Sequence, residues 1–326
     1  MGKGYKHGAG GESFANLIVT CPVGVAVTAS MGDKTYTKIS NTQGIAAFYA
    51  LDAGTWTVTI TEDGKVATKS IAVTTDFGIA LTFNVIPEFT YTGEFEIVND
   101  ADEPITASTD NWKIRFLTSG TLVITKLKSA ENSIDVFCVG GGGGGSSRSG
   151  NDGGAGGGGG YTATQNDVEM VVGQSYEIVI GQGGSSNADG TATTAFGFTA
   201  KGGKKGSGKT GGAGGSGGSN GSDGSSGRQT NGGPGGAGQG KTTREFGEDS
   251  GALYAGGGGG GGGSGNSGYG VHASGGPGGG GDGGGTGYNA KNGHANTGGG
   301  GGGGGYGSST IGSGGSGIVV IRNTRE

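Results

Sequence analysis

Residues 134–145 read IDVFCVGGGGGG, and this junction decides the fold. Its first half is a run of strand-forming apolar residues, and its second half is six consecutive glycines. Further along, residues 168–180 (VEMVVGQSYEIVI) and 191–200 (TATTAFGFTA) interrupt the glycine-rich stretch, and residues 318–321 (IVVI) follow it. A flexible glycine–serine linker needs no strand-forming segments inside it. We therefore predict a mainly β protein, in which glycine excursions are inserted between the strands of one sheet-based scaffold.

The glycine runs have matched lengths. Residues 256–263 and 298–305 each contain eight consecutive glycines, and residues 140–145 and 156–160 are nearly as long. An extended helix with three residues per turn rises about 3.1 Å per residue, and without side chains such helices can pack closely. Their N–H and C=O groups can then bond between helices. We expect inserted polyglycine type II helices that pack in parallel; the strict G-X-Y repeat of collagen is absent.

Composition and charge exclude several classes of protein. Only 30% of the 326 residues are apolar and 89 are glycine, which excludes one large conventional core. The net charge is -5, and no basic stripe is available to follow a phosphate backbone, so we expect no nucleic acid partner. Cys21 and Cys138 lie far apart within apolar runs, which favours buried free thiols over a disulfide.

The sequence predicts neither an export signal at the amino terminus nor a membrane span. The first twenty residues contain no uninterrupted apolar segment before a small-residue cleavage site, so we expect no export signal there. No stretch approaches 18 consecutive apolar residues. We predict no membrane insertion.

Composition divides the chain into four parts. We predict a flexible N-terminal segment (1–15), a small antiparallel β-sandwich (16–86), a strand-rich connector (87–139) and a glycine-rich domain closed by a C-terminal strand (140–326). The polar stretch 202–240 is compatible with either order or mobility. Residues 62–65 and 118–121 each predict a hairpin turn, the second with alternating apolar residues on both sides.

Residues 202–212, GGKKGSGKTGG, contain the pattern of a nucleotide-binding phosphate loop, with Gly203, Lys209 and Thr210 at the matching positions. Such a loop must end in a helix whose N-terminus faces the phosphates. The following residues are mostly glycine and serine, which disfavours a helix. In a chain this rich in glycine we interpret the pattern as a chance match, and we expect no cofactor.

Five ordered motifs carry a family resemblance. They are IDVFCVGGGGGG, GGAGGGGGYT, VVGQSYEIVIGQGG, TATTAFGFTAKGG and GGSGIVVIRN. Together they resemble the glycine-rich domain of tail fibres and receptor-binding adhesins of bacteriophages and prophages, over residues 89–323. The stretch GIAAFYALDAGTWTVTITEDGK (44–65) resembles prealbumin-like modules such as carboxypeptidase-regulatory and PEGA domains. The chain departs from the phage family in a polar insertion (201–248) and in the added sandwich.

The resemblance implies packed polyglycine helices whose connecting loops contact a host surface. We therefore expect a non-enzymatic adhesin in the virion tail, made in the host cytoplasm, that binds a bacterial surface glycan or protein and other tail proteins. A purely structural virion protein (collar, fibre or decoration) is the alternative, and a homotrimer and a monomer both remain open.

Loop aromatics are the candidate contact residues, because tyrosine offers a flat apolar face and a hydroxyl at low entropic cost. Phe246, Tyr269, His272 and Tyr288 lie in loops between runs. Tyr161 and Tyr306 directly follow glycine runs, which favours a role in capping them. The histidines His7, His272 and His294 lack a neighbouring cysteine or carboxylate at ligand spacing, and the loop carboxylates have little around them to raise a pKa, so we expect neither a metal site nor catalysis.

Overall fold

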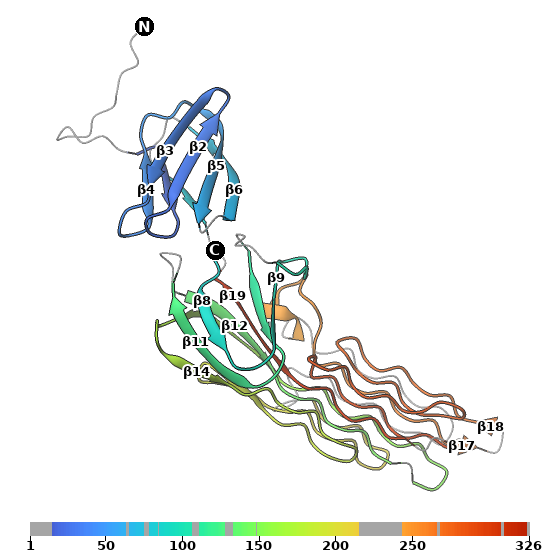
Figure 1. The fold of residues 1–326 in the computed structure, drawn as a ribbon. Coiled ribbons are helices and arrows are strands. Elements are labelled where there is room, and N and C mark those ends of the chain that lie inside the picture. Colours follow the sequence, from blue (N-terminus) through green and yellow to red (C-terminus); the bar gives the residue numbers. More distant parts are fainter. Residues whose placement is uncertain are drawn as a thin grey trace.

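The computed structural model describes residues 15–62, 65–74, 78–83, 85–105, 111–127, 133–147, 149–214, 243–265, 268–307 and 310–324. Almost all of the predicted flexible segment 1–15, and residues 215–240 of the polar stretch, lie outside this part of the chain. Figure 1 shows a small N-terminal sandwich, a middle layer of strands that we call the base, and long segments that extend away from the base.

The N-terminal part is a sandwich of two sheets. One sheet has the order β3-β2-β5-β6 and the other β4-β1-β7. Their bounds are β1 Leu17–Thr20, β2 Ala26–Met31, β3 Lys34–Ile39, β4 Ile45–Phe48, β5 Gly54–Glu62, β6 Lys65–Val73 and β7 Ile79–Thr82. Alternate residues of β5 (Trp56, Val58 and Ile60) point into the core between the sheets, as the period-2 pattern of a half-buried strand requires.

Two details of the sandwich test the sequence prediction. The hairpin predicted at residues 62–65 is confirmed, because β5 and β6 pair antiparallel with Glu62 opposite Lys65. The sandwich is not purely antiparallel, however, because β1 and β7 pair in parallel. The chain leaves the three-stranded sheet, crosses to the other sheet and returns, and such a crossover permits a parallel pair where a hairpin would not.

The base contains two sheets that share one core. The five-stranded sheet has the order β13-β12-β19-β10-β9 and the three-stranded sheet has the order β14-β11-β8. Their bounds are β8 Glu88–Tyr91, β9 Phe95–Val98, β10 Lys113–Phe116, β11 Gly120–Lys126, β12 Ser133–Val139, β13 Thr162–Glu169, β14 Ser175–Ile178 and β19 Ile318–Asn323. A short hairpin of β15 (Thr193–Ala195) and β16 (Phe198–Ala200) adds to the same core.

The second predicted hairpin is wrong. The strands on either side of residues 118–121 do not pair: β10 bonds to β9 and β19, and β11 bonds to β8 and β14. Their alternating residues are buried as expected, with Ile114 and Phe116 facing Leu122 and Ile124 inside the shared core. The turn therefore connects two facing sheets, a geometry that the same alternation also fits.

The chain enters and leaves the glycine region through neighbouring strands. β12 and β19 are antiparallel partners, with Val139 opposite Ile318. Both strands are buried on their two faces, since one face joins the shared core and the other packs against Phe246, Tyr254 and Ala255. This explains why IDVFCV and IVVI are continuous apolar runs rather than alternating ones.

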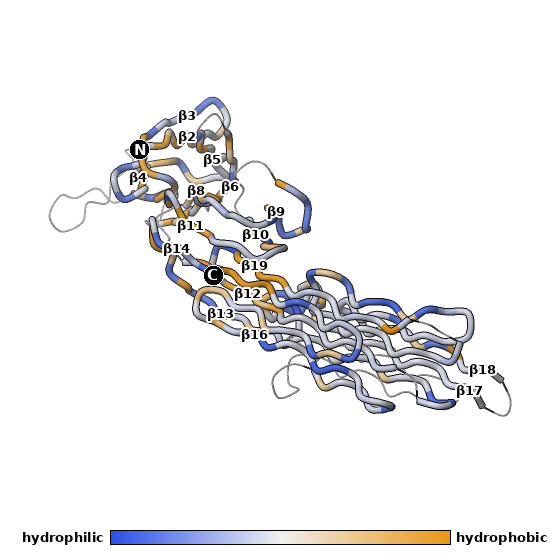
Figure 2. The backbone as a smooth tube through the Cα atoms, turned by 60° about the horizontal axis from the view of Figure 1, so that its bottom comes forward, coloured by the Kyte–Doolittle hydropathy of each residue, from blue (hydrophilic) through white to orange (hydrophobic). Residues whose placement is uncertain are grey.

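Beyond the base, the chain runs back and forth in extended stretches that we call the glycine segments. Within the described residues they are 140–146, 153–160, 180–185, 188–192, 201–206, 211–214, 255–263, 270–276, 280–285, 288–293, 298–305 and 310–317. Figure 1 shows them side by side, and Figure 2 shows that much of their length is neither strongly apolar nor strongly polar, with hydrophilic and hydrophobic stretches in between. They are assigned neither to α-helices nor, with small exceptions at turns, to strands.

Backbone hydrogen bonds between these segments repeat every third residue. In segment 140–146, amides three residues apart donate to the same neighbouring stretch. The amides of residues 140, 143 and 146 donate to the carbonyls of residues 161, 158 and 155, respectively. Those of residues 141 and 144 donate to residues 191 and 188, and those of residues 142 and 145 donate to residues 315 and 312. A repeat of three residues is that of an extended polyglycine type II helix. Each segment thereby bonds to several neighbours at once, whereas a strand bonds only to its two sides.

The all-glycine runs occupy the interior of this bundle. All residues of 140–146, 153–160, 256–263 and 298–305 are buried. The two eight-glycine runs are parallel neighbours, as predicted, with the amides of Gly300 and Gly303 donating to the carbonyls of Gly256 and Gly259. Outer segments need a small residue only where they face inward. In segment 270–276 the buried positions are 270, 273 and 276 (Gly, Ala, Gly), while Val271 and Ser274 are exposed.

Candidate functional site

The end of the bundle farthest from the base, which we call the distal end, is formed by turns. They lie at residues 147–152, 186–187, 207–210, 264–269, 286–288 and 306–309, apart from the few positions there that are not described. Their residues are mainly serine, asparagine, threonine, glycine and tyrosine, together with an aspartate and a lysine. This is the composition of antibody contact loops, in which tyrosine supplies area and small polar residues supply adaptable hydrogen bonds.

Two predicted contact residues pack against each other at this end. The rings of His272 and Tyr288 lie 4.3 Å apart between centroids, and Tyr288 is 59% exposed. The backbone holds them in place, because Tyr288 and Gly285 exchange two N–H···O bonds of 2.9 and 3.0 Å across a tight turn. A side chain at Gly285 would press against the backbone nitrogen of His272. The two rings therefore form one aromatic surface, of which Tyr288 is the more exposed part.

Tyr269 belongs to the same region. Its backbone lies in β18 (Gly268–Tyr269), which pairs with β17 (Ser264–Gly265) in a hairpin at the distal end of the molecule in Figure 1. The position of its side chain is not described. Val271, two residues further on, is 60% exposed beside the stacked rings. Tyr269, His272 and Tyr288, chosen as separate loop aromatics, thus come from adjoining stretches of chain.

Phe246 does not belong to this surface. It lies in the 3₁₀ helix η3 (Glu245–Gly247), is 9% exposed, and packs 5.8 Å from the ring of Phe137 in β12. The guanidinium of Arg322 covers its ring at 4.0 Å. The loop between glycine runs that contains Phe246 returns to the base rather than to the distal end, so the proposal of Phe246 as a contact residue is corrected.

The other aromatics after glycine runs lie at opposite ends. Tyr161 is half-buried against the core of the base. Tyr306 is half-buried at the distal end, where its amide donates to the carbonyl of Gly262 at 2.7 Å. Each tyrosine follows the last glycine of its run, a placement that fits the expected capping role.

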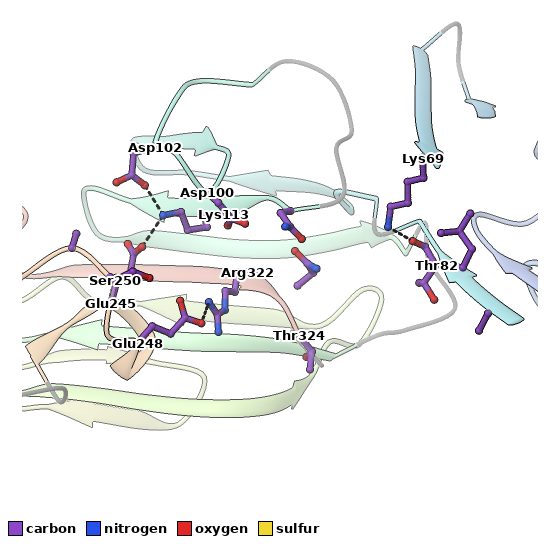
Figure 3. Close-up of a pocket in the computed structure, with 16 residues that line it drawn as sticks. Lys69, Thr82, Asp100, Asp102, Lys113, Glu245, Glu248, Ser250, Arg322 and Thr324 are labelled. Carbon is purple, nitrogen blue, oxygen red and sulfur yellow. Dashed lines mark hydrogen bonds and ion pairs between the residues drawn. The ribbon is translucent and has the colours of Figure 1, made fainter. Parts of the chain in front are cut away.

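A polar cavity of about 610 Å³ lies where the sandwich meets the base (Figure 3). The sandwich contributes Lys69 and Thr82, and the base contributes Lys113, Glu245 and Arg322. The ammonium of Lys113 is 2.5 Å from a carboxylate oxygen of Asp102 and 2.7 Å from one of Glu245. Because Lys113 and Glu245 are almost fully buried, their charges depend on this pairing.

Other charged side chains in or beside the cavity are also paired. Arg115 binds Asp102 at 2.6 Å, and Arg322 binds Asp135 at 3.0 Å and Glu248 at 2.6 Å. Burial opposes ionisation of Asp102, but hydrogen bonds from Lys113 and Arg115 outweigh it and hold the pKa of Asp102 below its ordinary value. Asp102 thus stays ionised at neutral pH and cannot serve as a proton donor. The cluster ties η3 to β10 and the turn before it.

The stretch that matches a phosphate loop is a hairpin of two glycine segments. Ser207 and Thr210 exchange backbone bonds of 2.9 and 2.8 Å, which closes a tight turn. The amides of Gly203 and Gly206 donate into the bundle, to Gly141 and Gly144. The side chain of Lys209 binds Asp152 at 3.1 Å. These amides are bonded to neighbouring segments and do not converge on a phosphate-sized space.

Cys21 and Cys138 are buried free thiols, as predicted, and burial raises the pKa of Cys138 to about 12. Among the described residues, His, Cys, Asp and Glu side chains form no group of three that could hold a metal ion. Within the same residues, no helix has the length and apolar character needed to span a membrane.

The model of one protein family, the glycine-rich domain, matches residues 117–324. The match spans β11, the glycine segments and β19, and it covers more than half of the chain. The protein belongs to this glycine-rich domain family. No curated protein and no solved structure matches the chain.

Proposed function

We propose that the protein is a non-enzymatic tail fibre or tail-tip adhesin of a bacteriophage, which binds a bacterial surface glycan or protein through the distal turns of the glycine bundle. The observation that carries the proposal is the exposed ring of Tyr288, which packs against the half-buried ring of His272 on a hydrogen-bonded turn at the distal end. Exposed tyrosine held in one conformation binds with little further loss of entropy. The N-terminal sandwich, at the opposite end of the molecule in Figure 1, then faces the other tail proteins.

The arrangement supports a binding role over chemistry. In the cavity of Figure 3, Lys113, Glu245 and Arg322 are paired within the base. The distal turns, in contrast, expose hydroxyls, amides and aromatic faces. Their side chains point outward from a backbone core, so a turn can change in sequence without repacking the interior.

The test is adsorption of labelled protein to a panel of bacterial strains. We expect strain-selective binding, and Tyr288→Ala is expected to weaken it about 30-fold, the effect of losing an aromatic hot spot of about 2 kcal/mol. Tyr49→Ala is the matched control, because Tyr49 is similarly exposed (50%) but lies on the sandwich.

Two results would contradict the proposal. Equal loss of binding in the Tyr288 and Tyr49 variants would mean that the distal end has no specific role in recognition. No binding to any strain of a broad panel would favour the structural virion protein instead, and the search would turn to partners within the particle.

A further inference from the structure

The hairpin of residues 201–210 places lysines outward along one side of the bundle. This short basic row corrects the expectation that no basic stripe is present, because the net charge of the chain does not show how the lysines are grouped in space. Gly203 and Gly206 face inward and are buried, whereas Lys201, Lys204, Lys205 and Lys209 are exposed. Lys201 and Lys204 are one repeat apart and so share a face, and Lys205 lies on the adjacent face. At about 3.1 Å per residue, the row extends about 19 Å from residue 201 to the turn at 207.

Nearby acids neutralise only part of this row. Lys204 binds Asp189 at 2.8 Å and Lys209 binds Asp152 at 3.1 Å, in exposed pairs that contribute little and are screened by salt. Among the residues that the structure describes, the ammonium groups of Lys201 and Lys205 form no ion pair within 4.0 Å. Lys205 lies close enough to Asp189 that, against the effect of burial, its charge helps to lower the pKa of that carboxyl, and its amide donates to Asp189 at 2.9 Å, so Lys201 is the less neutralised of the two.

The bundle therefore differs in charge from the whole chain. Its described segments and turns carry lysines 201, 204, 205, 209 and 291 against aspartates 152, 189 and 282, a balance of 5 − 3 = +2, whereas the whole chain carries -5. Four of those five lysines belong to this single hairpin.

We propose that this lysine hairpin binds a linear, phosphate-bearing glycan of the bacterial surface, as a contact separate from the aromatic surface at the distal end. The inference rests on the proposed function for the identity of its partner. Lysine ammonium groups bind phosphates as point charges, and a row of them suits a polymer with repeated anionic groups. A nucleic acid is disfavoured, because residues 201–210 contain neither the aromatic side chains that stack bases nor an arginine.

The experiment measures binding of long-chain inorganic polyphosphate between 50 and 300 mM NaCl. We expect Lys201→Gln/Lys205→Gln to weaken binding about tenfold at low salt and to reduce the slope of log K against log salt by about 1.4, the value for two lost phosphate contacts on a flexible chain. The control Lys38→Gln/Lys126→Gln removes the same charge from the exposed sandwich and base and leaves the binding unchanged.

Three outcomes would overturn the inference: no binding of polyphosphate by the unmodified protein at 50 mM salt, equal weakening in both double variants, or preferential binding of single-stranded DNA of equal charge. Tyr288→Ala separates the inference from the proposed function, since it is expected to retain polyphosphate binding while losing adsorption to cells. Unchanged polyphosphate binding in the lysine variant, with adsorption still dependent on Tyr288, refutes the lysine site alone. Lysine-dependent polyphosphate binding without adsorption to any strain refutes the adhesin alone.

Discussion

Glycine has a steric role in the interior of the bundle. A Cβ added at Gly299, Gly300 or Gly301 would overlap a backbone carbonyl of a different neighbouring segment in each case. Three successive residues thus point at three neighbours, and none of these positions leaves space for a methyl group. Glycine runs are long where a segment is surrounded by other segments. Where a segment borders solvent, other residues interrupt the glycines.

One position in the same run is an exception and supplies a matched pair. At Gly300 an added Cβ would lie under 3.0 Å from the carbonyl of Gly157, whereas at Gly304 the nearest atom would be 3.4 Å away, an ordinary contact. We expect Gly300→Ala to destabilise the protein by about 3 kcal/mol or more, the upper range for overpacking, because backbone cannot rotate aside as a side chain can. Gly304→Ala should cost less than about 1 kcal/mol, and urea unfolding measures both.

The two variants keep the same buried amide bonds, since alanine retains the N–H of glycine. A similar loss of stability in both would mean that the close approach to the carbonyl of Gly157 is not what requires glycine in this run.

At the scale of elements, an ion-pair cluster joins the loop that contains η3 to the base. Glu245 in η3 binds Lys113 and also lies 3.4 Å from Arg115, and it accepts a hydrogen bond from Tyr254. Burial and the neighbouring Glu245 carboxylate raise the pKa of Tyr254, so its hydroxyl remains a donor. The cluster aligns η3 against β10, and Phe246 packs on the outer face of β12 as a result.

Removing the buried charge of Glu245 should loosen this contact. We expect Glu245→Gln to destabilise the protein by about 3 kcal/mol, because two cations are left with one buried acceptor fewer. Glu248→Gln removes an acid of the same type that is about half exposed and pairs with Arg322, and it should cost about 1 kcal/mol or less. Thermal unfolding at neutral pH compares the two variants, and equal shifts would show that burial of Glu245 does not matter.

The elements also show what could be predicted from sequence. Strand positions and the buried faces of β5, β10 and β11 follow from alternation, and continuous apolar runs mark β12 and β19. Pairing across residues 118–121 could not be predicted, because alternation fits a hairpin and a connection between facing sheets equally well. The place of Phe246 could not be predicted for a related reason: like Tyr269 and Tyr288 it lies between glycine runs in the sequence. Contacts with residues distant in sequence, such as the ion pair between Glu245 and Lys113, hold its loop at the base.

At the scale of the whole molecule, the apolar cores are separate. The core of the sandwich is formed by residues 17–85, whereas the cores on the two faces of the five-stranded sheet draw on residues 112–321. The cavity between the sandwich and the base is lined mainly by polar groups. The two parts thus have little apolar area to couple their unfolding.

Calorimetry should therefore resolve two unfolding transitions. We expect a chain reduced to residues 86–326 to lose one transition and to keep the other at an unchanged midpoint, because each core is complete on its own side of the junction. A single transition whose calorimetric and van't Hoff enthalpies agree would mean that the sandwich and the base unfold as one unit.

The backbone core of the bundle bears on how its stability changes with temperature. Unfolding a conventional core exposes mainly apolar surface and raises the heat capacity, whereas exposing polar surface lowers it. The buried runs of the bundle are lined by peptide groups, so their unfolding brings a small heat-capacity change for their length. A small heat-capacity change flattens the curve of free energy against temperature. The bundle, which we propose as the part that contacts the bacterial surface, would thus keep its free energy of unfolding over a wide range of temperature.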